Sequence, residues 1–370
     1  MIYLDHAATT PLRKEAFNVM LPYFAEHAAN ANALYAEGRK ARSAIDQARG
    51  QIADAIHAKS SEIYFTGGGS ESDNWALFGV MRALKGKNHI ITTQIEHHAI
   101  LNACAALESS GYDVTYVPVD QWGRVSPQDI EKAIRPETGL VSVMAANNEV
   151  GTIQPIAEIA RIAHAHGVLM HTDAVQAVGH IPIDVAALNV DLLSMAAHKF
   201  YGPKGIGALY IKNGVKITNL VYGGEQERGL RAGTENTPAI VGMGEALALA
   251  CSEMDGAAQQ IVHLRDLLEN EIMQRMPEAI VNGDREKRLP GTLHVTFPGA
   301  DTNMLLMRLD MEGIAVSAGS ACAAGARERS HVLEAMHVPS GADVRFSLGT
   351  DNDETQIRQT VETLYRILNG

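Results

Sequence analysis

The stretch DLLSMAAHKFYGPKGIGALYI, residues 191–211, contains two apolar runs separated by a polar turn. The first run, DLLSMAA, is followed at once by His198 and Lys199, and the second, GIGALYI, overlaps the end of the turn sequence GPKG. Continuous apolar runs of this length are typical of strands buried on both faces of a sheet. The stretch therefore predicts two buried strands, with a polar pair at the end of the first.

Five similar runs occur upstream, and helical patterns such as SDNWALFGVMRALKG separate some of them. The runs are EIYFTG, HIITTQ, DVTYVPV, GLVSVMAA and GVLMHTDA. Strands that alternate with helices are typical of an α/β domain whose mainly parallel sheet is covered by helices on both faces. We therefore expect a sheet of seven strands.

The pattern changes after about residue 255. A long helical pattern, QQIVHLRDLLENEIMQRM, ends before Pro277, and short strand patterns (GTLHVTF, GIAVS and DVRFSLG) then alternate with helices. This order predicts a smaller α+β domain. We expect a large domain over residues 14–255 and a small domain made of residues 1–13 and 256–370.

Composition and charge narrow the class of protein. The chain has 46% hydrophobic and 20% charged residues, as ordinary globular proteins do, and its net charge of -12 disfavours a broad nucleic-acid surface. No stretch has the roughly 18 apolar residues of a membrane span. Three widely spaced cysteines (Cys104, Cys251 and Cys322) suit a reducing compartment, so we expect a cytoplasmic protein without a disulfide framework.

Polar motifs follow the predicted strands, at the edge of an open α/β sheet where ligands bind. FTGGGSESDNW offers a glycine-rich anion cradle with a hydroxyl at a helix N-terminus, although a tight strand-to-helix turn also explains it. Each of the other motifs can also be explained by the fold alone, without a ligand. An Asp at a strand end, for example, is commonly a helix N-cap. The other strand-end residues are His97, His98, Asn147, Asn148, Asp173, Gln176, His198 and Lys199.

The combination of these groups favours one ligand. A phosphate cradle, a flat imidazole, an Asn, a carboxylate and a lysine suit a molecule with a phosphate, a phenolic oxygen, a ring nitrogen and an aldehyde. Pyridoxal 5'-phosphate has all four, and it needs a lysine amine for its aldehyde and a carboxylate for its ring nitrogen. We therefore expect pyridoxal 5'-phosphate as the cofactor.

The whole chain resembles the cysteine desulfurases of the class V aminotransferase family, which are dimeric pyridoxal-phosphate enzymes of fold type I. The resemblance rests on motifs that occur in the family's order: YLDHAATTP, SESDN, IEHHA, NNEVGT, TDAVQAVG, AHKFYGPKGIGALY, GGEQERGLRAGTEN, SAGSAC and VRFSLG. It implies the fold-type-I architecture, a homodimer, L-cysteine as substrate and a protein that accepts sulfur.

The resemblance also implies roles for single residues around the cofactor. Lys199 would form the Schiff base, Asp173 would pair with the ring nitrogen, and His97 would stack on the ring. The remaining cofactor contacts would be Gln176 and Asn148 near the phenolic oxygen, and Gly69, Ser70, His198 and a partner subunit's Thr234 at the phosphate.

On the substrate side, Asn30 and Arg345 would bind the carboxylate, for which a planar guanidinium is well suited. Cys322, in a loop of small residues, would attack the substrate sulfur and keep it as a persulfide while alanine leaves. No resident metal is expected, although Cys322 could be a transient iron–sulfur ligand.

Two other functions remain open at this point. One is a related enzyme on the same scaffold, such as a selenocysteine lyase or a transaminase, but a transaminase has no use for a mobile thiol. The other is a non-catalytic scaffold component whose thiol holds an iron–sulfur cluster, which usually needs four thiolates. The sulfur acceptor, in iron–sulfur cluster assembly or transfer-RNA thiolation, is not identified by the motifs.

The chain departs from the family pattern at a few positions. Ala196 replaces a Ser whose hydroxyl normally helps to hold the phosphate, so we expect weaker cofactor binding unless another group compensates. Tyr35 replaces a His on the substrate side, and Ala318 replaces a Ser close to Cys322.

Overall fold

A sheet of seven strands forms the centre of the larger part of the molecule, in the order β2-β8-β7-β6-β5-β3-β4. The computed structural model describes residues 1–319 and 329–370. Only β8 runs antiparallel to its neighbours, so the predicted mainly parallel seven-stranded sheet is confirmed. The strands are β2 (Ile63–Thr66), β3 (His89–Thr93), β4 (Asp113–Val117), β5 (Thr138–Ser142), β6 (Leu169–Asp173), β7 (Leu192–Ala196) and β8 (Gly207–Ile211).

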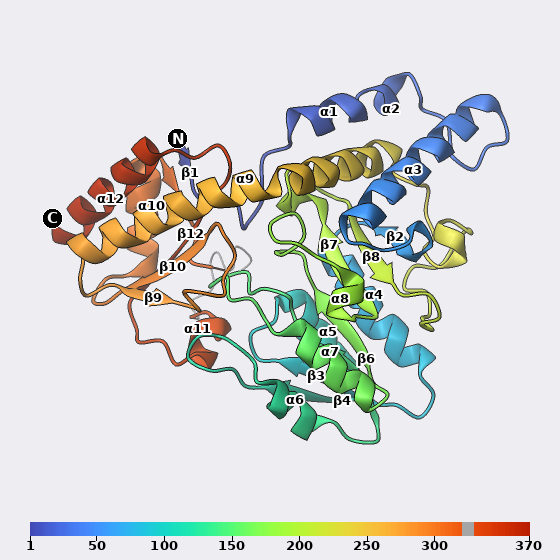
Figure 1. Ribbon diagram of the computed structural model, residues 1–370, viewed down its shortest axis with the longest axis horizontal. Coiled ribbons are helices and arrows are strands. Elements are labelled where there is room, and N and C mark those ends of the chain that lie inside the picture. The colour runs from blue at the N-terminus through green and yellow to red at the C-terminus, as the bar shows by residue number, and fades with distance from the viewer. Residues whose placement is uncertain (320–328) are drawn as a thin grey trace.

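Helices cover both faces of this sheet (Figure 1). Neighbouring strand residues point to opposite faces, so Leu192 packs in one apolar cluster with α4 (Gly69–Ala83) and α5 (His98–Glu108), while Leu193 packs in another. That second cluster is the larger core and includes α3 (Ala36–Ala55) and α7 (Ile156–Ala165). Burial on both faces explains why these strands read as continuous apolar runs.

Shorter elements complete the larger part. They are the helices α1 (Lys14–Met20), α2 (Pro22–Ala25), α6 (Pro127–Ala133) and α8 (Val185–Leu188), and the 3-10 turns η1 (Ser60–Glu62), η2 (Ala197–Lys199) and η3 (Glu227–Gly229).

One helix of 39 residues, α9 (Thr237–Arg275), joins the two parts of the molecule (Figure 1). Its first half contributes Met243 and Leu247 to the core of the larger part, and its second half contributes Leu264 and Leu268 to a separate apolar cluster. The helix thus runs unbroken through residue 255. The predicted division into a large domain (14–255) and a small domain (1–13 and 256–370) stays a prediction.

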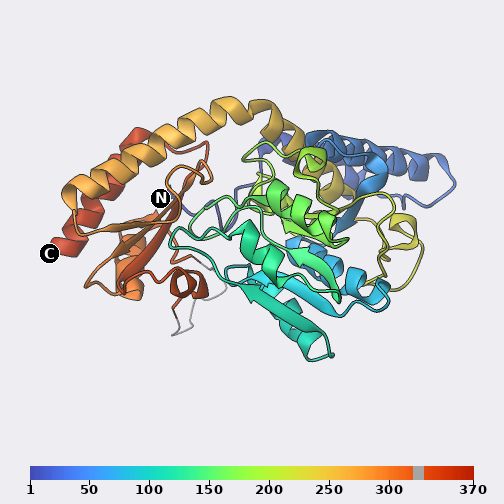
Figure 2. The same cartoon turned by 60° about the horizontal axis from the view of Figure 1, so that its bottom comes forward.

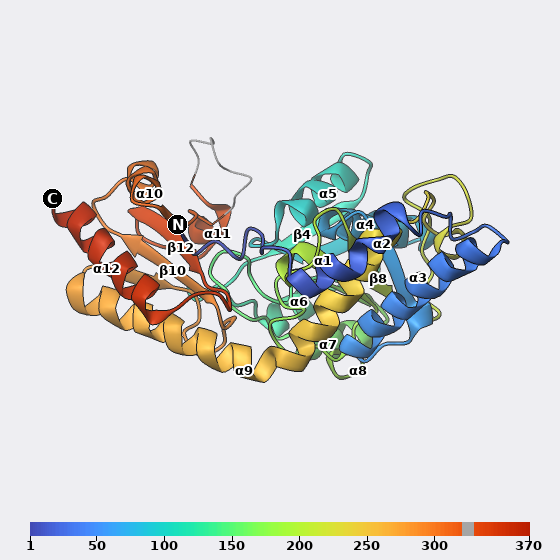
Figure 3. The same cartoon turned by 90° about the horizontal axis from the view of Figure 1, so that it is seen from above.

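The smaller part is built on a three-stranded antiparallel sheet in the order β12-β10-β9. Figures 2 and 3 show α9 and α12 lying together along this sheet. The strands are β9 (Ile280–Asn282), β10 (Thr292–Phe297) and β12 (Ala342–Ser347), and the helices are α10 (Thr302–Met311), α11 (His331–Ala335) and α12 (Glu354–Asn369).

The N-terminal segment connects the two parts a second time. β1 (Ile2–Tyr3) pairs with β11 (Ile314–Ala315), and Asp5 then bridges to Ser347 at the end of β12. Five residues later, the Thr10 amide donates a hydrogen bond of 2.9 Å to the His198 carbonyl, after β7. The segment therefore passes between β12 and the strand ends of the large sheet. Among the residues that the structure describes, no helix is long and apolar enough to cross a membrane.

Candidate active site

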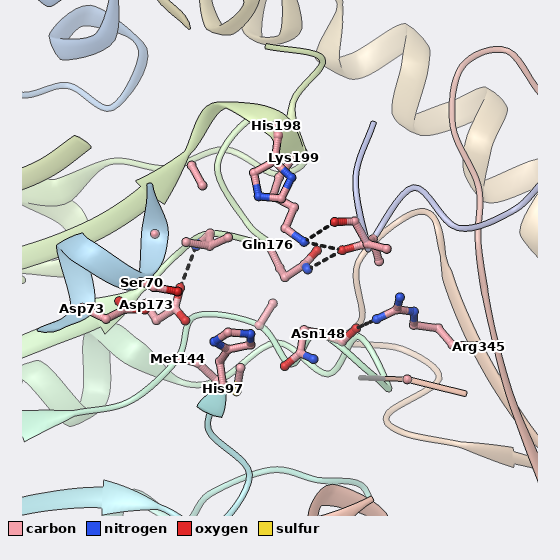
Figure 4. A pocket seen from close by; sticks show the side chains of 17 residues that line it. Ser70, Asp73, His97, Met144, Asn148, Asp173, Gln176, His198, Lys199 and Arg345 are labelled. Carbon is pink, nitrogen blue, oxygen red and sulfur yellow. Dashed lines mark hydrogen bonds between the residues drawn. The ribbon is translucent and has the colours of Figure 1, made fainter. Parts of the chain in front are cut away.

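A cavity of about 250 Å³ lies at the carboxyl ends of the central strands, between the large sheet and β12 (Figure 4). It contains nine of the predicted site residues, which come from β6, η2, β12, α4 and the loops after the strands. They are Gly69, Ser70, His97, Asn148, Asp173, Gln176, His198, Lys199 and Arg345.

The amine of Lys199 reaches into the cavity from η2, directly after β7. Its Nζ donates to the backbone oxygens of Ala7 (2.5 Å) and Ala8 (2.9 Å). The Gln176 side chain donates from Nε2 to the same Ala7 oxygen, at 2.9 Å. Two carbonyls of the N-terminal segment thus fix the lysine and the glutamine at one end of the cavity, as Figure 4 shows.

Asp173 is the last residue of β6, and its Oδ1 accepts a hydrogen bond from the Val175 amide at 2.9 Å. Burial raises the pKa of Asp173, while the nearby His97 and Lys199 oppose this rise. Side-chain ligand atoms of Asp73, His97 and Asp173 all lie within 4.8 Å of one another. The Oδ1 atom of Asp73 is buried and has no hydrogen-bond partner among the described residues. The deep end of the cavity therefore offers carboxyl groups with capacity for a ligand proton.

His97 caps the N-terminus of α5, and its Nδ1 accepts from the Ala99 amide at 3.1 Å. This bond leaves the ring proton on Nε2. Burial lowers the pKa of His97, so the ring is neutral near pH 7. A flat, neutral imidazole beside Asp173 is suited to stack on an aromatic ring and to donate from Nε2.

The wall of the cavity that contains Gly69 and Ser70 is suited to an anion, because these residues begin the fifteen-residue helix α4 there. The preceding Gly68 has φ 151° and ψ −178°, a conformation that side chains exclude. A Cβ on Gly69 would lie 2.7 Å from Cγ2 of Val175, so glycine is required there for close approach.

His198 completes this wall. Its Nδ1 lies 3.2 Å from Oγ1 of Thr9, and burial, together with the Lys199 and Lys204 charges, lowers its pKa to about 4. The ring is therefore neutral near pH 7, and it can act as a hydrogen-bond donor without adding charge to the site.

Arg345 lies on β12 with only 2% of its surface exposed. Its Nη1 donates to the Asn148 carbonyl at 2.7 Å and its Nη2 to Oδ1 of Asp5 at 2.8 Å. Its Nε is buried and has no hydrogen-bond partner among the described residues. Arg345 lines the cavity, and a guanidinium at this position is suited to bind a ligand carboxylate.

Two predicted residues lie outside the cavity. Asn30 and Thr234 are both exposed, and Oδ1 of Asn30 accepts from the Asn32 amide at 2.8 Å. The Asn32 side chain in turn donates to the carboxylate of Glu235, so the loops around Asn30 and Thr234 are neighbours on the surface. Within one chain, neither residue lines the cavity that holds the other described site residues. The predicted nucleophile, Cys322, and its loop lie outside the described residues.

The structure also brings in residues to which the motifs gave no role. Asp5, Ala7, Ala8 and Thr9 belong to the motif YLDHAATTP. Ala7 and Ala8 contact the site through backbone oxygens, which leave no signature in a sequence, whereas Asp5 and Thr9 use side-chain oxygens. Asp73 lies within the motif SESDN, where it reads as an ordinary helix residue.

A family model described as aminotransferase class-V matches residues 2–360 of this chain. The chain belongs to the class-V aminotransferase family. Among class-V proteins, it is 49% identical over 372 residues to the cysteine desulfurase IscS of Dictyoglomus turgidum, covering 99% of this chain and 94% of that protein. It is 50% identical over 373 residues to the cysteine desulfurase IscS of Clostridium botulinum strain Hall, with the same coverage.

Solved structures agree with the class-V assignment. A structure described as a NifS-like protein is 39% identical, with a TM-score of 0.94 over 100% of this chain and 99% of that one. A structure of SspA in complex with cysteine is also 39% identical, with a TM-score of 0.84 over 95% of this chain and 99% of that one. These matches confirm the predicted family and its fold.

Proposed function

We propose that this chain is a cysteine desulfurase that uses pyridoxal 5'-phosphate to convert L-cysteine to L-alanine. The observation that carries the proposal is the cavity in which the Lys199 amine, the Asp173 carboxyl and the Arg345 guanidinium meet. The predicted desulfurase activity is confirmed by the matches of about 50% identity, over nearly the whole chain, to proteins named cysteine desulfurase IscS. These matches do not favour the alternative of a selenocysteine lyase.

The residues around the cavity fit the cofactor. Gly69 leaves room where a Cβ would collide with Val175, and the N-terminus of α4 with Ser70 would hold a phosphate. Asp173 would hold the proton of the ring nitrogen, and the Asp73 Oδ1, which accepts no hydrogen bond from the described residues, lies beside it. When bound, the cofactor supplies an electron sink for the charge that develops when the substrate loses its α-proton.

The side chains of the chain divide the remaining work. Arg345 would bind the substrate carboxylate and so fix the α-carbon relative to Lys199. The Lys199 amine would take the proton from that carbon, a role for which the Ala7 and Ala8 carbonyls already hold it in the cavity. His97 would donate from Nε2, because its Nδ1 accepts from the backbone.

Cys322 is the proposed sulfur acceptor within the chain. Its thiolate would form a bond to the substrate sulfur as the carbon–sulfur bond breaks, and the bonding electron pair would stay with the carbon skeleton that becomes alanine. The thiol is suited to this step because the thiolate is the nucleophilic form of cysteine. The product is a persulfide on Cys322, whose outer sulfur atom can pass to a second protein.

The proposal includes a homodimer in the cytoplasm. A second copy would bring Thr234 to the phosphate of the first copy's cofactor, which agrees with the exposed position of Thr234 outside its own cavity. Asn30 lies near the same surface, through the contact of Asn32 with Glu235. Sulfur would pass to an acceptor protein of iron–sulfur cluster assembly or transfer-RNA thiolation.

Product analysis tests the proposal. The purified holoenzyme is incubated with L-cysteine and a thiol reductant, and alanine, sulfide and pyruvate are quantified. We expect alanine and sulfide in equal amounts, and neither product above background without the cofactor. Formation of pyruvate without alanine would show a different reaction and would contradict the proposal.

A further inference from the structure

Arg345 is tied on two sides before any substrate binds. The Asn148 carbonyl accepts from Nη1 at 2.7 Å, and Oδ1 of Asp5 accepts from Nη2 at 2.8 Å. A guanidinium is planar and carries five N–H donors, so two bonds to different nitrogens fix both the position and the tilt of its plane. Arg345 lies at the edge of the cavity with its guanidinium held in this way, as Figure 4 shows.

The backbone holds Asp5 in place independently of its side chain. The Ser347 amide donates to the Leu4 carbonyl at 2.7 Å, and the His6 amide donates to the Ser347 carbonyl at 3.1 Å. Asp5 is thereby bridged to β12 two residues beyond Arg345, and Leu4 is fully buried. The Asp5 carboxylate is thus attached to the same rigid strand as the arginine that it contacts.

The segment that carries Asp5 also holds the lysine. Two and three residues later, the carbonyls of Ala7 and Ala8 accept from Nζ of Lys199. One short segment therefore sets the distance between the group that would bind the substrate carboxylate and the amine that would act at the α-carbon. A misplacement of about 1 Å between such groups costs roughly a hundredfold in rate.

We propose that Asp5 is a positioning residue that orients Arg345 for the carboxylate of an amino-acid substrate. The inference rests on the proposed function, because it assigns Arg345 to the substrate. Since Asp5 and the Asn148 carbonyl order the guanidinium in advance, the substrate does not have to order it on binding. Asp5 does not touch the reacting atoms.

The test compares two ligands that differ only in the carboxylate. Dissociation constants of L-alanine and ethylamine are measured by calorimetry for the holoenzyme of the wild type and of Asp5→Ala, Asp5→Asn and Asp351→Ala. The last variant is the matched control. Asp351 bonds His6 of the same segment at 2.9 Å, whereas the side-chain hydrogen bonds of Arg345 go to Asn148 and Asp5.

We expect Asp5→Ala to weaken L-alanine binding about tenfold, the loss of one hydrogen bond to a charged group, and to leave ethylamine binding unchanged. Asp5→Asn keeps an oxygen acceptor, so we expect it to restore most of the affinity for L-alanine. The KM for L-cysteine should follow the same order, with a smaller change in kcat. Asp351→Ala should bind both ligands as the wild type does.

Two results would overturn the positioning role. One is an equal loss for L-alanine and ethylamine in Asp5→Ala, which would indicate a general structural effect. The other is an equal loss of L-alanine binding in Asp5→Asn and Asp5→Ala. Failure of the proposed function would look different, because the wild type itself would then form no alanine from L-cysteine, whereas the calorimetric comparison does not depend on turnover.

Discussion

Replacing Ala196 by Ser should strengthen cofactor binding. Ala196 ends β7, is 1% exposed and borders the cavity. Its Cβ lies 3.6 Å from the position that a Cβ on Gly69 would take, so a hydroxyl at residue 196 would be close to the N-terminus of α4. This wall is the proposed phosphate site, and Ala196→Ser would add a donor to it.

The magnitude follows from the charge of the phosphate. A hydrogen bond to a charged group contributes about 1.5–3 kcal/mol, which is about a 10- to 150-fold lower dissociation constant. Without cofactor, the same hydroxyl is buried and lacks that partner, which costs about 1–3 kcal/mol. We therefore expect opposite effects, namely tighter cofactor binding and a less stable cofactor-free protein.

The assay is a titration of the cofactor-free protein with pyridoxal 5'-phosphate, followed by absorbance, together with thermal unfolding of the cofactor-free form. Ala197→Ser is the matched control, because Ala197 is equally buried but does not border the cavity. Ala197→Ser should lower the stability without a gain in affinity. An unchanged dissociation constant in Ala196→Ser, or an equal change in both variants, would refute the placement of the phosphate beside residue 196.

Three further predictions concern single side chains. Lys199→Ala should lack the absorption band of a lysine-bound aldehyde and lose alanine formation by about 10²–10⁴-fold, and a normal spectrum would contradict the role of Lys199. Burial raises the pKa of Glu96 to about 8, so the folded protein favours the protonated form of this side chain. The contribution of Glu96 to the free energy of unfolding is therefore complete below about pH 4.5 and is lost as the pH rises to 8. Glu96→Gln should therefore flatten the fall in unfolding free energy over this range, by a few kcal/mol, in denaturant titrations at several pH values. Cys322→Ser should bind L-cysteine, as judged by a change in cofactor absorbance, but release almost no sulfide, and normal turnover would exclude Cys322 as the nucleophile.

The strands of the large sheet could be predicted from the sequence because they are buried on both faces. DLLSMAA and GIGALYI correspond to β7 and β8. The strand order could not be predicted, since it depends on crossovers that leave no local pattern, and neither could the reversed direction of β8. The long helix α9 was only partly predicted, because its exposed middle, around residue 255, lacks the apolar face of a packed helix.

The side chains of the site were predictable where each lies at or just after the end of a strand, as Asp173 and Lys199 do, because parallel strands end at one edge of the sheet. The contacts of Ala7 and Ala8 were not, since carbonyl groups are the same in every residue. Asp5 was missed because its partner, Arg345, lies 340 residues away in the chain. The roles of Asn30, Thr234 and Cys322 stay predictions.

The most direct test of the central claim is mass spectrometry of the holoenzyme after one addition of L-cysteine, without reductant. We expect the peptide that contains Cys322 to gain the mass of one sulfur atom, in an amount equal to the alanine formed. The peptides that contain Cys104 and Cys251 should stay unmodified. Alanine formation without added sulfur on Cys322, or no alanine at all, would contradict the claim that this chain is a desulfurase with Cys322 as its sulfur carrier.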